Sequence, residues 1–118
     1  MQALYAAAGG ALGAASRFLI SKLPPVSHGL PLPTFLANLI GCFLMGFIAA
    51  KSEARGMDPN VQIFLKTGFC GGLTTFSAFS AETVAMLEKG HVPTAMLYVA
   101  ATLATGFIAL YAGSQLFK

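Results

Sequence analysis

Charged residues are scarce in this chain. Only 9% of its 118 residues are Asp, Glu, Lys or Arg, while 56% are hydrophobic and the mean hydropathy is +0.73. Soluble domains have roughly 25% charged residues, so this composition excludes a soluble globular domain. A membrane span takes about 20 mostly apolar residues. A single all-α membrane domain of four spans with short connections would therefore occupy residues 1–118.

Signatures of catalysis and of metal binding are also missing. The sequence has no Ser–His–Asp set, no H-E-x-x-H motif, no phosphate loop and no paired carboxylates inside an apolar span. Cys42 and Cys70 lack C-x-x-C spacing and are expected to be small apolar fillers. His28 and His91 fall in connections between spans and are assigned no role. The sequence thus predicts a protein that is not an enzyme.

Prolines, glycines and charges mark the ends of the apolar stretches. The predicted spans cover residues 1–23, 34–50, 61–87 and 94–117. The connection over residues 24–33 has four prolines, and the charged connection over residues 51–60 ends in Asp58-Pro59-Asn60, where Asp58-Pro59 predicts a helix start. Residues 1–23 lack a basic segment before their apolar run, so we expect a mature span rather than a signal peptide.

The third predicted span is interrupted. Its middle, residues 68–80, has the pair Gly71-Gly72 and four hydroxyl residues at membrane depth. Lipid cannot hydrogen-bond a freed backbone, so such a break survives only where protein buries it or where it lines a polar cavity. We expect the helix to open at Gly71-Gly72 and to expose carbonyls from Gly71 to Thr74, a donor set that binds small cations such as Na⁺.

Aromatic and hydroxyl side chains follow the break at helical spacing. Phe76 and Phe79 are separated by three residues, as are Ser77 and Ser80 on an adjoining face. Two phenylalanines at this spacing usually pack a helix interface. An aromatic ring also has a positive edge that favours an anion lying in the ring plane. The segment therefore predicts an ion or substrate site.

The other polar residues inside the spans have two interpretations each. Arg17 lies near the end of the first span, where it either snorkels to the headgroups or lines a vestibule that attracts anions. Asn38 either donates its amide to a dehydrated anion or forms an interhelical hydrogen bond. For Glu82 and Glu88 we favour structural roles over a place in a vestibule.

Small residues and basic residues predict how the spans assemble. Gly9 with Gly13 and Gly68 with Gly72 have the spacing that lets helix backbones approach closely in lipid. The seven basic residues divide into four on one predicted side and three on the other: Lys51, Arg55, Lys66 and Lys118 against Arg17, Lys22 and Lys89. Such a balanced count predicts insertion in both orientations and leaves no basic patch for nucleic acid. Because four short spans enclose little volume, a polar pathway would form more easily with a second subunit.

At these residues the chain closely resembles the Fluc (CrcB) family of dual-topology fluoride channels. The similarity runs in order along essentially the whole sequence, and the third-span motif is highly specific. The matching pieces are Gly9-Gly10, Gly13-Ala14, Arg17-Phe18, Thr34 to Asn38, Gly41 to Phe43, Gly46, and Gly71 to Ser80.

The resemblance implies an antiparallel homodimer with two fluoride pathways and a structural Na⁺ at its centre. Backbone carbonyls of Gly71 and Thr74 would hold the sodium ion. The implied fluoride pathway comprises Asn38, Phe76, Phe79, Ser77, Ser80, Arg17, Tyr98 and Thr102. Two positions depart from the family pattern: Ala78 replaces a usual Thr or Ser, and Pro33 precedes Thr34 where Gly is usual.

The sequence therefore predicts a passive fluoride channel of the cytoplasmic (inner) membrane, crossing it several times. The main alternative is a proton-coupled exporter of the small multidrug resistance type. Such exporters need a carboxylate in the first span, which this chain lacks. A membrane anchor without transport would explain the packing glycines but not the polar break.

Overall fold

The computed structural model describes residues 1–24 and 30–117, and all regular structure within them is helical. Three single helices are long and apolar enough to cross a membrane: α1 (Gln2–Ile20), α2 (Leu32–Arg55) and α6 (Val92–Ser114). The predicted third span is a composite of α3 (Pro59–Gln62), the π-helix η2 (Ile63–Cys70), α4 (Gly71–Leu73) and α5 (Phe76–Glu88). A short 3-10 turn, η3 (Gln115–Phe117), follows α6. The all-helical membrane fold with a broken third helix is confirmed, while His28 and Lys118 lie outside the described residues.

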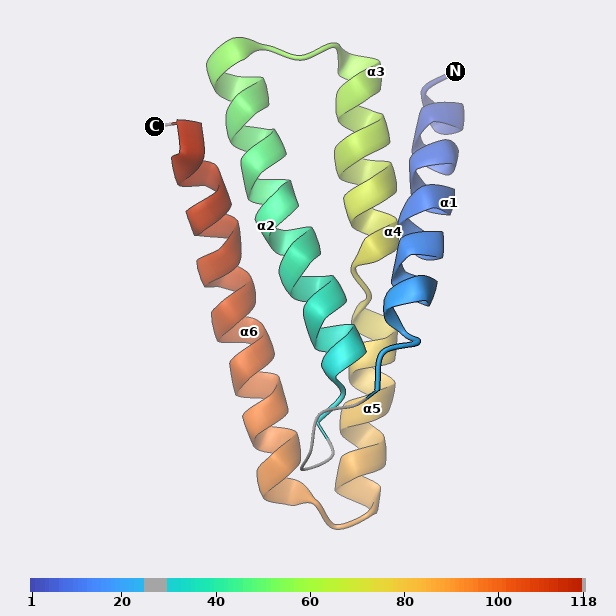
Figure 1. Ribbon diagram of the computed structural model, residues 1–118, viewed down its shortest axis with the longest axis vertical. Helices are drawn as coiled ribbons and strands as arrows, with labels where there is room; N and C mark the ends of the chain where they lie inside the picture. Colours follow the sequence, from blue (N-terminus) through green and yellow to red (C-terminus); the bar gives the residue numbers. More distant parts are fainter. Residues whose placement is uncertain (25–29, 118) are drawn as a thin grey trace.

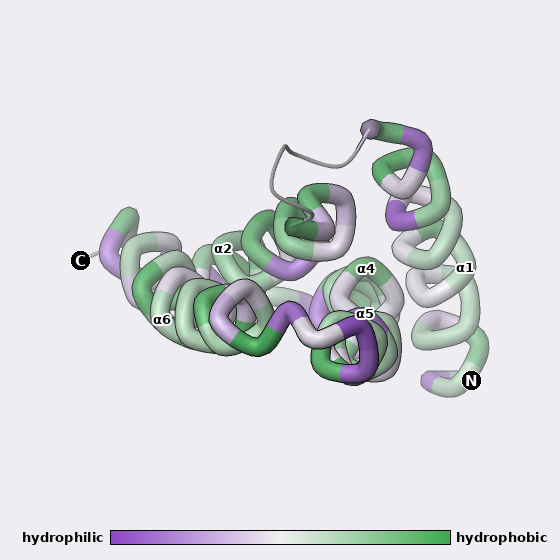
Figure 2. Tube along the Cα trace, turned by 90° about the horizontal axis from the view of Figure 1, so that it is seen from below, coloured by the Kyte–Doolittle hydropathy of each residue, from purple (hydrophilic) through white to green (hydrophobic). Residues whose placement is uncertain are grey.

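The helices α1, α2 and α6 and the composite of α3, η2, α4 and α5 lie side by side and alternate in direction (Figure 1). The N-terminus, the α2–α3 connection and the C-terminus lie at one end, and the α5–α6 connection lies at the other. Seen along the bundle in Figure 2, α6 neighbours α2, while α1 packs mainly against the first half of the broken segment. The molecule extends 48 × 31 × 19 Å.

Local chemistry explains the helix ends. Pro33 lies in the first turn of α2, where its missing N–H costs nothing, so the helix begins before the predicted Thr34. The same helix continues through the charged residues to Arg55 and ends at Gly56, whose φ is +74°. The prediction that all of residues 51–60 form a connection is therefore wrong in its first half. The predicted helix start is confirmed, because the Asp58 side chain accepts a hydrogen bond from the Asn60 amide at 2.8 Å.

Glycines allow two backbone-to-backbone helix contacts. A Cβ built on Gly46 would lie 2.8 Å from the carbonyl carbon of Leu110, and one on Gly113 would lie 3.0 Å from the Phe47 nitrogen. These two positions bring α2 and α6 together. On the other side, a Cβ on Gly9 would lie 2.9 Å from the Phe69 nitrogen, and Gly13 is equally tight against Leu73. The close packing predicted for the Gly9 and Gly13 pair is confirmed.

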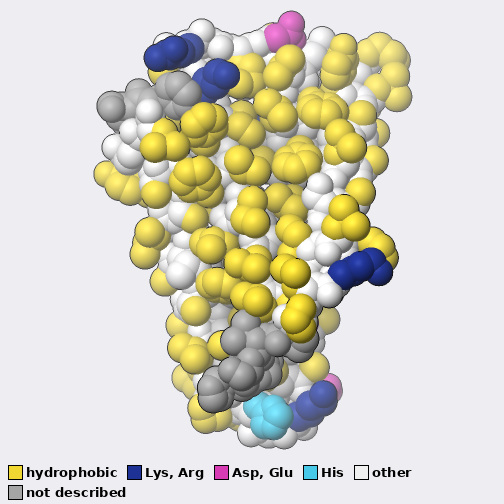
Figure 3. All heavy atoms as spheres, in the orientation of Figure 1, with side chains coloured by type: hydrophobic (Ala, Val, Ile, Leu, Met, Phe, Trp, Pro, Cys, Tyr) yellow, Lys and Arg dark blue, Asp and Glu magenta, His cyan; other side chains and the backbone are white. Residues whose placement is uncertain are grey.

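Most of the apolar surface remains uncovered by the chain itself. Of the most apolar stretch of each long helix, 11% is buried in α1, 22% in α2 and 17% in α6. Hydrophobic side chains cover the face drawn in Figure 3, and the charged groups visible there lie near the two ends and at one edge. This distribution fits a protein surrounded by lipid or by another apolar surface.

Candidate functional site

The third pass breaks at Thr74 and Thr75, not at the paired glycines. Thr74 (φ −84°, ψ 151°) and Thr75 (φ −148°, ψ 118°) are extended and separate α4 from α5. Gly71 has regular helical angles (φ −63°, ψ −37°). The predicted opening at Gly71-Gly72 is therefore wrong by three residues, although a break at membrane depth is present.

Close packing accounts for at least one of these glycines. A Cβ on Gly72 would lie 2.6 Å from the Gly10 carbonyl oxygen and 3.1 Å from the Ala14 nitrogen, so α1 requires glycine there. Gly71 is exposed, and a Cβ on it would meet only the Lys66 carbonyl oxygen, at 3.8 Å. A side chain at Gly71 would therefore meet little of its own protomer, because that side of the helix is open.

Asn38 from α2 pairs with the extended residue Thr75. The Thr75 amide donates to Asn38 Oδ1 at 2.7 Å, and Asn38 Nδ2 donates to the Thr75 carbonyl at 3.3 Å. The side-chain amide thereby replaces the helical hydrogen bonds that the break removes. Nδ2 carries two hydrogens, so a second N–H remains for a ligand. Asn38 therefore forms the interhelical hydrogen bond that was one of its two predicted roles, and its second N–H is still able to donate to an anion.

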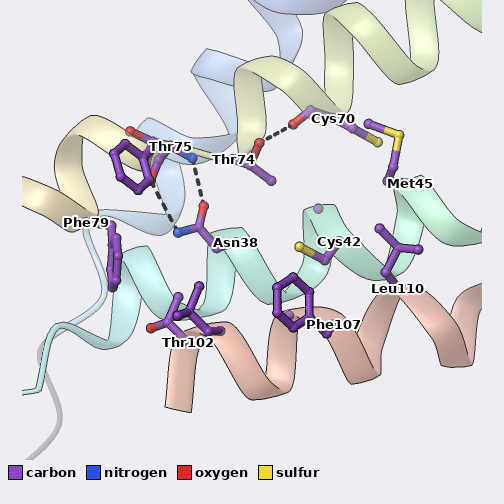
Figure 4. Close-up of a pocket in the computed structure, with 14 residues that line it drawn as sticks. Asn38, Cys42, Met45, Cys70, Thr74, Thr75, Phe79, Thr102, Phe107 and Leu110 are labelled. Carbon is purple, nitrogen blue, oxygen red and sulfur yellow. Dashed lines mark hydrogen bonds between the residues drawn. The ribbon is translucent and has the colours of Figure 1, made fainter. Parts of the chain in front are cut away.

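A groove of ≈380 Å³ runs along α2, the break and α6 (Figure 4). Five residues predicted from the sequence or from the family resemblance line it: Asn38, Thr74, Phe76, Phe79 and Thr102. The hydroxyl oxygen of Thr102 is buried and has no hydrogen-bond partner among the described residues. Cys42 and Cys70 also line the groove; Cys70 is fully buried, as expected of an apolar filler.

Three aromatic rings continue from the groove along α5 and α6. The Phe76 and Phe79 ring centroids are 6.0 Å apart with the planes tilted by 52°, and Phe79 lies 5.1 Å from Tyr98. Phe79 and Tyr98 are buried, whereas Phe76 is 78% exposed on the open face. Phe76 therefore offers its ring to whatever covers this face.

Tyr98 and Thr34 converge on Glu82. The Tyr98 hydroxyl donates to Glu82 Oε1 at 2.9 Å, and Thr34 Oγ1 donates to Oε2 at 2.8 Å. One hydroxyl from each of two neighbouring helices thus satisfies a carboxylate at membrane depth. The structural role favoured for Glu82 agrees with these contacts, while Glu88 is exposed at the end of α5.

The remaining predicted residues lie around the break rather than in the groove lining. Ser77 is exposed and its Oγ lies 3.3 Å from Thr75 Oγ1, while Ser80 is half-buried on the same helix. Arg17 of α1 is half-buried, and its Nε donates to the Gly72 carbonyl at 3.1 Å. The guanidinium is thus turned toward the protein backbone.

The break changes the partners of several backbone groups. In a continuous helix the Thr75 amide would bond the Gly71 carbonyl, and the Ala78 amide would bond that of Thr74. Here the Thr75 amide donates to Asn38, and the Ala78 amide donates to Thr75 Oγ1 at 3.1 Å. The Gly71 and Thr74 carbonyls therefore lose their regular helical donors. They fit the donor set predicted for Na⁺, although the described residues contain no cluster of three or more His, Cys, Asp or Glu side chains for a metal.

Sequence reasoning missed two threonines. Thr75 caps α5, and Thr34 holds Glu82. The sequence did contain a signal for Thr75, because threonine is common at the position immediately before a helix. Thr34 and Glu82 are 48 residues apart, and no spacing rule connects them.

Comparisons with known proteins identify the family of this chain. A model of the family described as "CrcB-like protein, Camphor Resistance (CrcB)" matches residues 4–114. A protein from Chlorobium phaeobacteroides (strain DSM 266) named fluoride-specific ion channel FluC is 44% identical over 108 residues, covering 90% of this chain and 84% of that protein. Proteins of the same name from Methylobacillus flagellatus (38% identical, 99% and 94% covered) and Ignicoccus hospitalis (39%, 98% and 95%) are also similar. The chain thus belongs to the CrcB family.

Proposed function

We propose that the protein is a fluoride channel that lets the anion cross the membrane passively, down its electrochemical gradient. The observation that carries this proposal is the groove at the break, where the Asn38 amide lies beside the Phe76 and Phe79 rings. The relatives named as fluoride-specific ion channels support the choice of anion.

Fluoride is small and strongly hydrated, so a selective pathway must replace its water with fixed donors. The second N–H of Asn38, the Thr102 hydroxyl and the positive edges of the two phenylalanine rings supply such donors along the groove. Tyr98, Ser77 and Ser80 extend this polar track along α5 and α6. A pathway too narrow for the larger chloride ion would exclude it.

A second copy of the chain, inserted in the opposite orientation, completes the pathway in this proposal. The groove is open on one side, and Phe76 at its edge is 78% exposed. An open apolar groove with polar groups at its base is poorly suited to lipid alone. The near-equal division of basic residues supports insertion in both orientations, which an antiparallel homodimer requires.

A sodium ion on the dimer axis is part of the same proposal. The Gly71 and Thr74 carbonyls, both freed from their helical donors, would hold it. Its role would be structural: a cation there offsets repulsion between the carbonyls and raises the local potential for anions. A passive pathway needs no sodium gradient.

Fluoride release from liposomes tests the function directly. Purified protein is reconstituted in fluoride-loaded and in chloride-loaded vesicles. A cation ionophore is added so that anion efflux does not build up a membrane potential, and efflux is followed with ion-selective electrodes. We expect rapid fluoride efflux, little chloride efflux and no dependence on an imposed proton or sodium gradient.

Absence of fluoride efflux from vesicles that contain folded protein would refute the proposal. Transport that requires a proton gradient would instead favour the drug-exporter alternative, which no observation on this chain supports. Expression in a bacterium with separated membrane fractions tests the proposed inner-membrane location.

A further inference from the structure

Arg17 lies on the face of α1 that contacts the broken segment. Gly13 and Ala14, one turn earlier, lie against Leu73 and Gly72 with backbone atoms in direct contact. The next turn of this face presents Arg17, whose Nε donates to the Gly72 carbonyl at 3.1 Å. The side chain therefore reaches the last turn of the helix that precedes the break.

The identity of the bonded carbonyl matters. The Gly71 and Thr74 carbonyls at this helix end lack their regular donors, because the Thr75 amide donates to Asn38 and the Ala78 amide donates to the Thr75 hydroxyl. The Gly72 carbonyl lies between them in sequence and receives the Arg17 Nε instead. One carbonyl is thus fixed toward α1, on the side away from the groove. This fixes the direction of the peptide plane between Gly72 and Leu73.

The position also suits a positive charge. Helices α3, η2 and α4 run continuously from Pro59 to Leu73, so the unpaired carbonyls at their end form a negative pole. A half-buried guanidinium that bonds one of these carbonyls is held by the protein and is not free to follow an ion in solution. This geometry differs from that of a charge placed to attract anions into a vestibule.

We propose that Arg17 is a positioning residue: it fixes the Gly72 carbonyl and so sets the conformation of the break on which the fluoride pathway and the cation site depend. This inference rests on the proposed channel function. It assigns the effect of Arg17 on conduction to the hydrogen bond from Nε and not to attraction of anions by its charge. Asn38 of α2 bonds Thr75 on the other side of the break, so two different helices fix the backbone before and after it.

Two substitutions distinguish the hydrogen-bond donor of Arg17 from its positive charge. In Arg17→Gln, the side-chain nitrogen follows the same number of bonds as Nε, so the donor to Gly72 is kept and the charge is lost. In Arg17→Lys, a methylene group occupies the Nε position and the charge is kept about 1.5 Å farther out. We expect Arg17→Gln to retain fluoride efflux within about threefold of the original chain. Because a lost hydrogen bond to a buried carbonyl disfavours the fixed conformation, Arg17→Lys should lose about tenfold or more.

Salt dependence provides a second readout. If Arg17 attracted anions electrostatically, Arg17→Lys would conduct normally and Arg17→Gln would lose both flux and its dependence on ionic strength. That result would overturn the proposal, as would equal losses in both variants. Retained flux in Arg17→Gln with unchanged salt dependence supports it.

Hydrogen–deuterium exchange keeps this test separate from the channel assignment. Amide exchange over residues 71–78 in purified protein should be faster in Arg17→Lys than in Arg17→Gln, whether or not the protein conducts fluoride. If the original chain fails to conduct while this difference persists, the proposed function is wrong and the positioning role stands. Equal exchange in both variants overturns the positioning role itself.

Discussion

Replacing Gly13 with alanine should separate α1 from the broken segment and reduce conduction. A Cβ on Gly13 would lie 2.8 Å from the Leu73 nitrogen and 3.1 Å from the Gly72 carbonyl carbon, and closer still to the Phe69 carbonyl oxygen. All three are backbone atoms, so no side chain can rotate to make room. The added methyl group therefore has to move the helices apart.

The size of this effect follows from ordinary contact distances. Non-bonded heavy atoms prefer separations of about 3.5–4.0 Å, so α1 must retreat by about 1 Å near Gly13. Overpacking of this kind costs about 1–3 kcal/mol, partly offset by the gain of about 1 kcal/mol when alanine replaces glycine in a helix. A retreat of about 1 Å also stretches the 3.1 Å bond between Arg17 and Gly72 beyond hydrogen-bonding distance.

Gly10→Ala is the matched control in the same helix. A Cβ there would meet only the Gly68 carbonyl oxygen, at an ordinary 3.9 Å. We expect this variant to be neutral or slightly more stable in thermal unfolding in detergent and to conduct fluoride normally, while Gly13→Ala unfolds at lower temperature and loses flux. Equal melting temperatures and equal fluxes for the two variants would refute the packing argument.

Three further outcomes are expected. Asn38→Asp keeps an acceptor for the Thr75 amide but loses the N–H donors and adds a negative charge. Fluoride efflux from liposomes should therefore collapse, while size-exclusion chromatography still shows a dimer. Normal fluoride flux would show that Asn38 only packs the helices. Reporter fusions after Lys118 should appear on both faces of the membrane, and a single orientation would contradict dual topology. Gly71→Ala has room within one protomer, so it should weaken dimerisation and cation binding without unfolding the monomer; anomalous scattering from Tl⁺ on the dimer axis would check the site, and an empty axis would remove it.

The order of the long helical segments could be predicted because apolar length and proline-rich or charged connections determine them locally. The break could be predicted too, but its position could not. Gly71 and Gly72 have the residue type expected of an opened helix, yet Gly72 is needed for the contact with Gly10. The chain opens instead at Thr74 and Thr75, two β-branched residues that favour extended backbone.

The partners of the polar residues depend on tertiary structure. Thr75 is 37 residues from Asn38, and Gly72 is 55 residues from Arg17. A sequence can indicate that an amide or a guanidinium at membrane depth needs a partner, but not which backbone group provides it. The π-helical turn of η2 was likewise missed, because its wider hydrogen bonding has no distinctive residue pattern.

The hydrogen bonds to Glu82 have a consequence for how the chain is made. Synthesis proceeds from the N-terminus, so Thr34 is already in the membrane when Glu82 arrives, but Tyr98 follows 16 residues later. Until α6 has been inserted, the carboxylate has only one of its two hydroxyl partners, and α5 lacks the helix against which Phe79 packs. The first half of the third pass meets α1 without waiting for any later segment. The break therefore divides this pass into a half that packs on an earlier helix and a half whose main partner, α6, is made later.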